Sequence, residues 1–243
     1  MIVPERDKAI LKTYTLNVAG SSYAAQLIRK KGRRRITIIV FPDNRLEIRA
    51  PLKMPEISIQ NFLRQSSPWI QKRLSKNANG PRVLPLQYTE GESIPFLGKE
   101  LTLEYKAGAR RTTQSDETLF LPRNTNAKHN IETWYKRQAT QIFQSSIERY
   151  APLIGRTPLR FTVRRMRSRW GSCSSKGSLS LNWKILAAPQ SVIDYLVVHE
   201  LAHLVEQNHS KRFWAVVGKA MPDFYEARKW LKTHGNAILV RFG

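Results

Sequence analysis

The chain has 243 residues, of which 41% are hydrophobic and 24% are charged, a composition typical of a soluble globular protein with a sizeable core. Its 41 Lys and Arg against 18 Asp and Glu give a formal net charge of +23, which favours a polyanionic partner such as a nucleic acid, although a generally basic proteome would produce the same charge. The sequence shows no signal-peptide pattern and no apolar run of membrane length, which predicts a cytoplasmic protein without membrane contact. It has a single cysteine, Cys173, so no internal disulfide is expected.

The first half of the chain, residues 1–125, is predicted to be a β-rich domain. β-Branched and aromatic residues are frequent between residues 13 and 50, and apolar residues alternate with polar ones over 36–48 around the turn sequence PDN. This pattern indicates several strands, of which the last two form a hairpin. A second, shorter hairpin is predicted around Gly98.

A short helical segment is expected between these two hairpins. Apolar residues recur with helical spacing over residues 56–75. Pro68 interrupts this pattern, and because proline is well tolerated at the first position of a helix, we predict that it begins a second helix capped by Ser67. The polar stretch that follows the second hairpin predicts a domain boundary near residue 125.

The second half, residues 126–243, is predicted to be an α+β domain. A long amphipathic helix is expected over residues 131–150, followed by strands in LRFTVRRM and SLSLNWKIL with the turn RSRWGSCSSKG between them. A further helix begins near Ser191, which forms a capping-box pattern with Asp194, and it is expected to continue through residue 207. Helices complete the C-terminal part of this domain.

Three of the five histidines lie within the eleven residues 199–209, at the end of the helix predicted from Ser191 and just beyond it. His199 and His203 are four residues apart, so they project from one face of the helix, where two imidazoles can bind one zinc ion. Glu200 follows the first histidine in an HExxH pattern and is placed to act as general base on a water that the metal activates. A buried helix with two hydrogen-bonded core histidines is the alternative, and the glutamate between them favours the metal site.

A metal site of this kind needs a third ligand, for which the sequence offers three candidates. Glu206 lies on the same helical face but a turn further from the metal, and Glu226 lies in a later helix. His209 follows Asn208, a residue type that tolerates the left-handed conformation at a helix end, so a turn there would bring His209 back over the metal. Ser210 can then cap the next helix. We favour His209.

These segments together resemble the YgjP-like family of predicted metal-dependent hydrolases. The shared order is an R-W-G-S-C turn at residues 169–173, an L-N-W strand at 181–183, H-E-L-x-H-L at 199–204 and N-H-S-x-x-F-W at 208–214. The family is similar in its core to SprT-like and other zincin metallopeptidases. The spacing also matches the metzincins, but Glu206 replaces their glycine.

The resemblance implies a zincin-like catalytic half, a zinc-dependent hydrolase and a peptide or protein substrate. It also implies which residues form the site: metal ligands at His199, His203 and His209, and a general base at Glu200. We expect one zinc ion per chain, although another divalent transition metal would also suit three imidazoles.

Zincins commonly pair an extended peptide with an edge strand, and the resemblance places that strand at SLSLNW, with Ser180 and Asn182 as candidate substrate-binding residues. Trp170 and Cys173 are expected to pack against neighbouring side chains and to have no chemical role. The sequence favours none of the candidates for stabilising the oxyanion, which are Tyr195, Tyr225, Arg169 and Arg228.

Two other functions stay open at this point. One is metal-dependent hydrolysis of a nucleotide phosphoanhydride by a pyrophosphatase, which the positive charge would suit, although magnesium held by carboxylates is more usual for that chemistry. The other is a nucleic-acid-associated module with a structural metal, against which Glu200 argues because a closed structural site needs no acid beside its ligands.

The densest positive charge lies in the sequence RKKGRRR, which is the candidate surface for contacts with phosphates. Its basic residues are Arg29, Lys30, Lys31, Arg33, Arg34 and Arg35. Such a cluster suits a nucleic acid, and a solvated charge run is the alternative.

Overall fold

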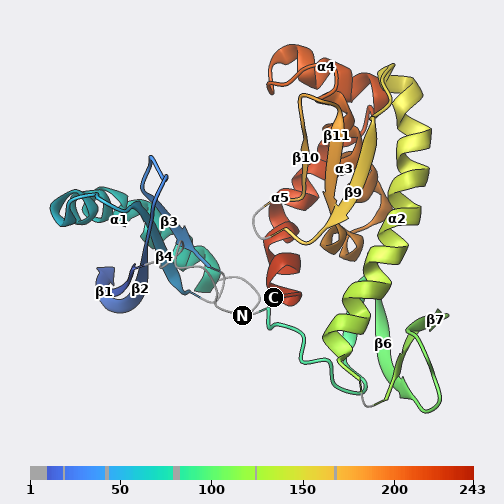
Figure 1. The fold of residues 1–243 in the computed structure, drawn as a ribbon, viewed down its shortest axis with the longest axis horizontal. Coiled ribbons are helices and arrows are strands. Elements are labelled where there is room, and N and C mark those ends of the chain that lie inside the picture. The colour runs from blue at the N-terminus through green and yellow to red at the C-terminus, as the bar shows by residue number, and fades with distance from the viewer. Residues whose placement is uncertain (1–9, 19, 42–43, 79–82, 124, 167–168) are drawn as a thin grey trace, which may run out of the picture. The chain divides into compact units, whose positions relative to one another are not determined.

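The computed structural model of the chain describes residues 10–18, 20–41, 44–78, 83–123, 125–166 and 169–243. These residues form helices and small mixed sheets, so the protein has the α+β class predicted from its sequence. They divide into two compact units, Met1–Val83 and Leu84–Gly243 (Figure 1), and each unit has its own hydrophobic core. No helix in the described part of the chain is long and apolar enough to cross a membrane.

The first unit consists of a four-stranded sheet and one long helix. In spatial order the strands are β1 (Ile10–Val18), β2 (Ser21–Lys30), β4 (Leu46–Pro51) and β3 (Thr37–Val40). β3 and β4 pair antiparallel, which confirms the predicted hairpin, while residues 42–43 of its turn lie outside the described residues. Every second residue of β4 is buried, and these side chains share a core with helix α1 (Glu56–Ala78).

Helix α1 continues through Pro68, so the predicted break and the predicted cap at Ser67 are wrong. A proline inside a helix removes a backbone hydrogen bond and costs about 3 kcal/mol. Leu63 and Ile70, on either side of Pro68, are both buried in the core of the first unit. Burial of each such side chain contributes about 1.5–3 kcal/mol, which offsets the cost of the proline and keeps the helix in one piece.

The second unit contains two small sheets. One has the order β5 (Ser93–Phe96), β6 (Lys99–Lys106), β8 (Thr118–Pro122) and β7 (Thr113–Ser115), and β5 and β6 form the predicted hairpin around Gly98. The other has the order β10 (Gly171–Cys173), β11 (Ser178–Asn182) and β9 (Arg160–Arg164). Strand β10 lies within RSRWGSCSSKG, where the sequence predicts only a turn; residues 167–168 of that segment are outside the described residues.

Helices α2 (Ala127–Ile154) and α3 (Gln190–Ala202) pack against the β10-β11-β9 sheet. Helix α2 is the predicted long helix, and it packs against β9, α3 and α4 (Lys211–Ala220). Helix α5 (Phe224–Arg241) packs against α3. Figure 1 shows α2 running along the second unit beside this sheet, with α3 and α5 nearby.

The predicted domain boundary near residue 125 falls inside the second unit. Leu119 and Leu121 of β8 are buried in the same core as Trp134 of α2. Phe96 of β5 also lies against Trp134, with ring centroids 4.7 Å apart. The polar segment near residue 125 therefore connects two parts of one core, and the compact units instead divide between residues 83 and 84.

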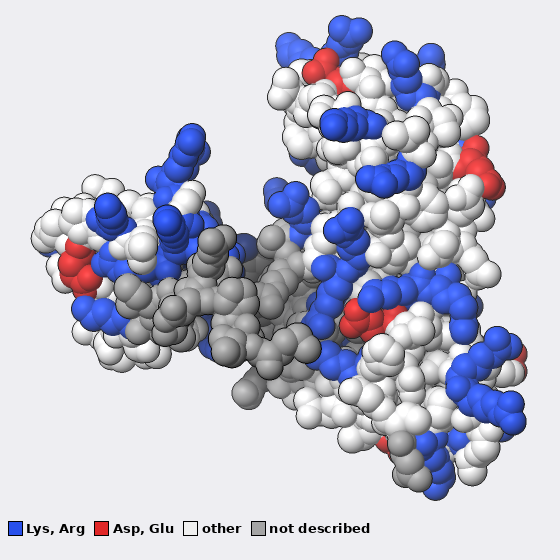
Figure 2. Space-filling view, viewed as in Figure 1, with Lys and Arg blue, Asp and Glu red and all other residues white. Residues whose placement is uncertain are grey.

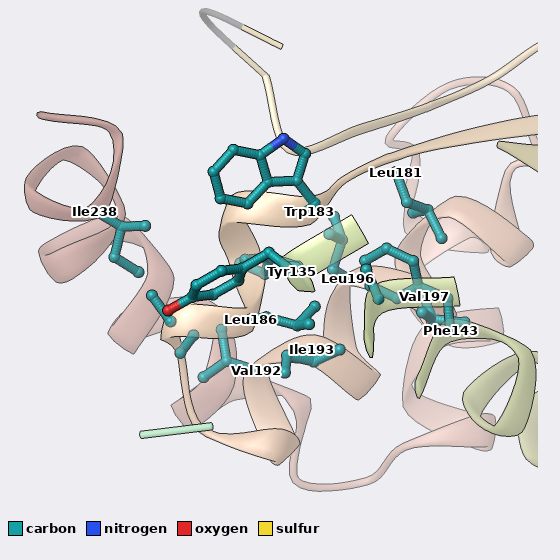
Figure 3. Close-up of a cluster of buried hydrophobic side chains, with 14 of the residues drawn as sticks. Tyr135, Phe143, Leu181, Trp183, Leu186, Val192, Ile193, Leu196, Val197 and Ile238 are labelled. Atoms are coloured by element: carbon teal, nitrogen blue, oxygen red, sulfur yellow. The ribbon is translucent and has the colours of Figure 1, made fainter. Parts of the chain in front are cut away.

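An aromatic layer supports helix α3 from within the core of the second unit. Trp183, predicted to continue strand β11, instead begins a short 3₁₀ helix (Trp183–Ala187). Its ring packs against Tyr135 and Phe242, with centroids 5.3 and 5.2 Å apart respectively. Figure 3 shows Tyr135 and Trp183 among apolar side chains that include Leu196 of α3. This packing fixes the helix that carries His199 and that ends at its C-cap residue His203.

Candidate metal and catalytic site

Helix α3 is a core helix, since residues 192–198 are all buried. It begins after Pro189 without a side-chain cap, so the predicted capping box of Ser191 and Asp194 is wrong. The Asp194 carboxylate instead accepts hydrogen bonds from Ser146 Oγ of α2 at 2.6 Å and from Gln190 Nε2 at 2.9 Å. A buried carboxylate needs such donors, and here they tie α3 to α2.

The helix ends at Ala202, five residues before the predicted end at residue 207. The predicted left-handed conformation of Asn208 is also wrong, because its φ is not positive. The chain turns earlier, where the backbone N–H of Glu206 donates to the Ala202 carbonyl at 3.0 Å and the side chain of Gln207 donates to the His203 carbonyl. The turn nevertheless returns the chain toward α3, as the sequence predicts.

The structure brings His199, His203 and His209 together. One ring nitrogen from each lies within 4.8 Å of the others, and Nε2 of His199 lies 3.0 Å from Nε2 of His209. Among the described residues this group holds the three histidines alone, so Glu206 and Glu226 lie outside it. Glu226 is exposed on α5.

This cluster fits a tetrahedral metal. Two ligand nitrogens about 2.0–2.1 Å from a zinc ion are separated by about 3.3 Å, close to the 3.0 Å between His199 and His209. Nδ1 of His203 lies 3.1 Å from the carbonyl oxygen of Glu206. A carbonyl only accepts, so Nδ1 carries the hydrogen and Nε2 is left unprotonated, as a metal ligand requires.

The electrostatic surroundings also favour neutral imidazoles. Burial, reinforced by His203 and His209, lowers the pKa of His199 to about 3. Burial and His203 likewise lower the pKa of His209. Metal binding requires neutral histidine, so at neutral pH these side chains are already in the form that binds a cation.

Glu200 is buried on the same helix, with 5% of its surface exposed. Burial raises the pKa of its carboxyl to about 7, against a smaller opposite effect of Arg169. Its Oε2 atom is buried and has no hydrogen-bond partner in the part of the chain that the structure describes. A carboxylate with a pKa near neutrality and a free oxygen can take up and release a proton during catalysis.

Strand β10 packs directly against Glu200. A Cβ atom at Gly171 would lie 2.5 Å from Oε1 of Glu200, a distance that real Cβ contacts do not show. Cys173 lies two residues further, and burial, with a contribution from Glu200, raises the pKa of its thiol to about 11. Residues two apart on a strand share a face, so both positions face the carboxylate. Cys173 is therefore a neutral packing residue, as expected.

Aromatic side chains of α4 line the other side of the histidines. Ser210 caps this helix as predicted, accepting from the backbone N–H of Phe213 at 3.3 Å. Phe213 is fully buried, with its ring centroid 4.6–5.0 Å from those of all three histidines. Trp214 stacks on His209, with centroids 5.9 Å apart. Both aromatics belong to the N-H-S-x-x-F-W motif, but the sequence alone gave them no role.

The structure contradicts the predicted substrate contacts. Strand β11 is central in its sheet, so SLSLNW has no open edge for a peptide. Asn182 is completely buried, and its amide donates to the carbonyls of Met166 and Arg169 at 3.0 and 3.1 Å. Ser180 lies 3.2 Å from the Thr162 hydroxyl. Asn182 thus ties Met166 and Arg169 to the end of β11, and Ser180 contacts the neighbouring strand β9.

The basic cluster is not a single free surface. Arg29 donates to the carbonyls of Leu52 and Met54 and pairs with Glu56 at 3.2 Å, so it is a structural residue of the first unit. Arg33 donates to the Thr37 hydroxyl and to a neighbouring carbonyl. Figure 2 shows Lys and Arg distributed over the visible face of both units. Nucleic-acid binding by the other residues of the cluster stays a prediction.

Comparison with protein families points to a metallopeptidase. The family model described as YgjP-like, metallopeptidase domain, matches residues 34–234. Among solved structures, the chain is similar to the crystal structure of the metallopeptidase zymogen of Pyrococcus abyssi abylysin, with 25% identity and a TM-score of 0.35. That similarity covers 37% of this chain and 92% of the other chain. No curated protein matches the chain.

Proposed function

The chain belongs to the YgjP-like metallopeptidase family and is a metal-dependent hydrolase, and from this premise we propose that it is a zinc peptidase. In this proposal His199, His203 and His209 hold the metal and Glu200 is the general base. The observation that carries it is the convergence of three imidazoles next to a buried carboxylate whose second oxygen has no hydrogen-bond partner among the described residues. A closed structural site would have no use for that carboxylate.

Each protein group has a defined task in peptide hydrolysis. His199, His203 and His209 would hold a zinc ion, which when bound would make a water acidic enough to react near neutral pH. Glu200 takes the proton from the attacking water and delivers it to the amide nitrogen as the peptide bond breaks. Phe213, which is fully buried and packs against the three histidines, lowers the local polarity, which strengthens these interactions.

We place the peptide on β10 instead of the central strand β11. Among the described residues β10 pairs only with β11, so its other edge has no strand partner within the sheet. Gly171 of this strand lies against Glu200, which would put an extended substrate on β10 close to the general base. Backbone hydrogen bonds to β10 would supply affinity with little sequence preference.

Hydrolysis of a set of quenched fluorescent peptides tests this function. We expect cleavage by the zinc-loaded protein, loss of activity with 1,10-phenanthroline and recovery when zinc is restored, because the water is activated only when the metal is present. Nucleoside triphosphates assayed for phosphate release under the same conditions are the control. Phosphate release without any peptide cleavage would replace this proposal with the pyrophosphatase alternative.

A further inference from the structure

An arginine that makes no ion pair with any described residue lies on Trp214, the aromatic ring that stacks on His209. Arg228 is exposed on α5, and its guanidinium carbon lies 4.1 Å from the centroid of the Trp214 ring. Trp214 in turn stacks on His209, at 5.9 Å between centroids and 26° between planes. Among the ion pairs of the described residues, none involves Arg228.

The support under this arginine is rigid. Phe224, four residues before Arg228, stacks on the same indole with centroids 5.6 Å apart. Residues four apart on a helix lie on one face, so α5 presents both Phe224 and Arg228 to Trp214. Phe213 meets Trp214 edge-on at 5.0 Å. The planar guanidinium is thus held against an aromatic surface while its N–H groups face solvent.

The charge of Arg228 acts on the groups around the site. Arg228 is held against Trp214, whose ring centroid lies 6.0 Å from that of His199 and 5.9 Å from that of His209. Histidine ligands carry no negative charge, so they would not neutralise the two positive charges of a bound divalent cation. Arg228 contributes one more positive charge, whereas Glu200 contributes a single negative charge. A site with this excess of positive charge attracts an anion.

We propose that Arg228 binds a carboxylate of the peptide substrate, so that the enzyme selects peptides with a negative charge near the scissile bond. This inference rests on the proposed peptidase function. The fork of a guanidinium matches the two oxygens of a carboxylate and gives two parallel hydrogen bonds. The net charge of +23 acts in the same direction, because it attracts acidic peptides and repels basic ones.

A carboxylate in a peptide comes either from an Asp or Glu side chain or from the C-terminus, and matched substrates separate these sources. The first peptide is neutral with an amidated C-terminus, the second has one Glu added, and the third is neutral with a free C-terminus. Each is assayed with the wild type, with Arg228→Ala and with Lys229→Ala. Lys229 is the next residue on α5, is also exposed and is not paired with the Trp214 ring in a cation–π contact, so its variant controls for the loss of one positive charge.

We expect Arg228→Ala to lower kcat/KM by about 10- to 100-fold for one of the two carboxylate peptides, while the neutral amidated peptide changes by less than about 2-fold. The peptide that loses rate identifies the source of the carboxylate. Lys229→Ala should change all three peptides equally. An equal loss on all three with Arg228→Ala, or no loss on any, would overturn the assignment.

Binding separates this inference from the proposed function. Dissociation constants for the same peptides are measured by calorimetry in a Glu200→Gln background, with and without Arg228→Ala, so that no turnover is needed. Weaker binding of a carboxylate peptide by about 10-fold or more on loss of Arg228 supports the inference even if the wild type cleaves no peptide. Cleavage by the wild type together with binding that does not depend on Arg228 would leave the peptidase and refute the role of Arg228.

Discussion

Replacing Glu200 by Gln is expected to lower kcat/KM for peptide hydrolysis by about 100-fold or more while the metal content stays unchanged. The amide keeps the shape of the side chain but cannot take a proton from water. The three histidines that we propose as ligands are untouched. The measurement is kcat/KM on a cleaved peptide, with zinc determined by elemental analysis of the same samples.

The control for this variant is Glu206→Gln. Glu206 contacts His203 through its backbone carbonyl, which the substitution leaves in place, so activity should stay within about 2-fold of the wild type. Full activity of Glu200→Gln would show that another group takes the proton. Equal losses in both variants would point to a general effect of removing negative charge near the metal.

Stability supplies a check that Glu200→Gln folds. Burial raises the pKa of Glu200 from 4.5 to about 7, so the folded protein without metal favours the protonated carboxyl. Ionisation therefore destabilises the fold increasingly as pH rises from about 4.5, and fully above about 7. Gln removes this effect, and the metal-free variant should have a Tm at pH 8 no lower than that of the wild type.

Gly171→Ala is expected to lower kcat/KM by about 10- to 100-fold through a displaced Glu200. The added Cβ would lie 2.5 Å from Oε1 and 2.7 Å from Cδ of Glu200. Strand β10 is held by its pairing with β11, where Gly171 is opposite Leu181, so the carboxylate must give way. Glycine is required here by close approach alone, since its φ is not positive. The measurement is kcat/KM together with metal content, which should be retained.

Gly218→Ala is the matched control. Gly218 lies in helix α4, where a Cβ would meet its nearest neighbour, Phe224, at an ordinary 3.7 Å. The change should leave activity intact and stabilise the helix by up to about 1 kcal/mol. Wild-type activity in Gly171→Ala would mean that Glu200 has room to move without effect. Loss of the folded circular dichroism spectrum would instead show that the contact is needed for the fold.

Patterns that depend on local sequence predicted much of the fold. The alternation in β3–β4 and β5–β6 and the helical period of α2 are properties of the segments themselves, and Ser210 has its own helix to cap. Predictions failed where distant contacts decide the outcome. Burial of the residues on both sides of Pro68 keeps α1 continuous. The Asp194 carboxylate accepts a hydrogen bond from Ser146 of α2, whereas the sequence predicted that it would belong to the cap of its own helix.

The same distinction applies to the site. His199 and His203 are grouped by helix geometry alone, so the sequence could place them together. The sequence predicted that His209 lies near the other two histidines, but the prediction relied on a helix through residue 207 and a left-handed Asn208. The structure has neither feature. Strand β10 has three residues and no distinctive alternation, so its contact with Glu200 could be found only in three dimensions. Asn182 looked available for substrate because a sequence does not show burial.

The metal content of purified protein after reconstitution with zinc tests most directly whether His199, His203 and His209 hold a zinc ion. We expect one zinc per chain in the wild type and in Glu226→Ala, and less than about a tenth of that in His209→Ala, because removing one of three imidazoles leaves too few ligands. Elemental analysis gives the ratio for all three proteins in parallel. A wild type that binds no transition metal would contradict the account, as would a His209→Ala variant that keeps zinc while Glu226→Ala loses it.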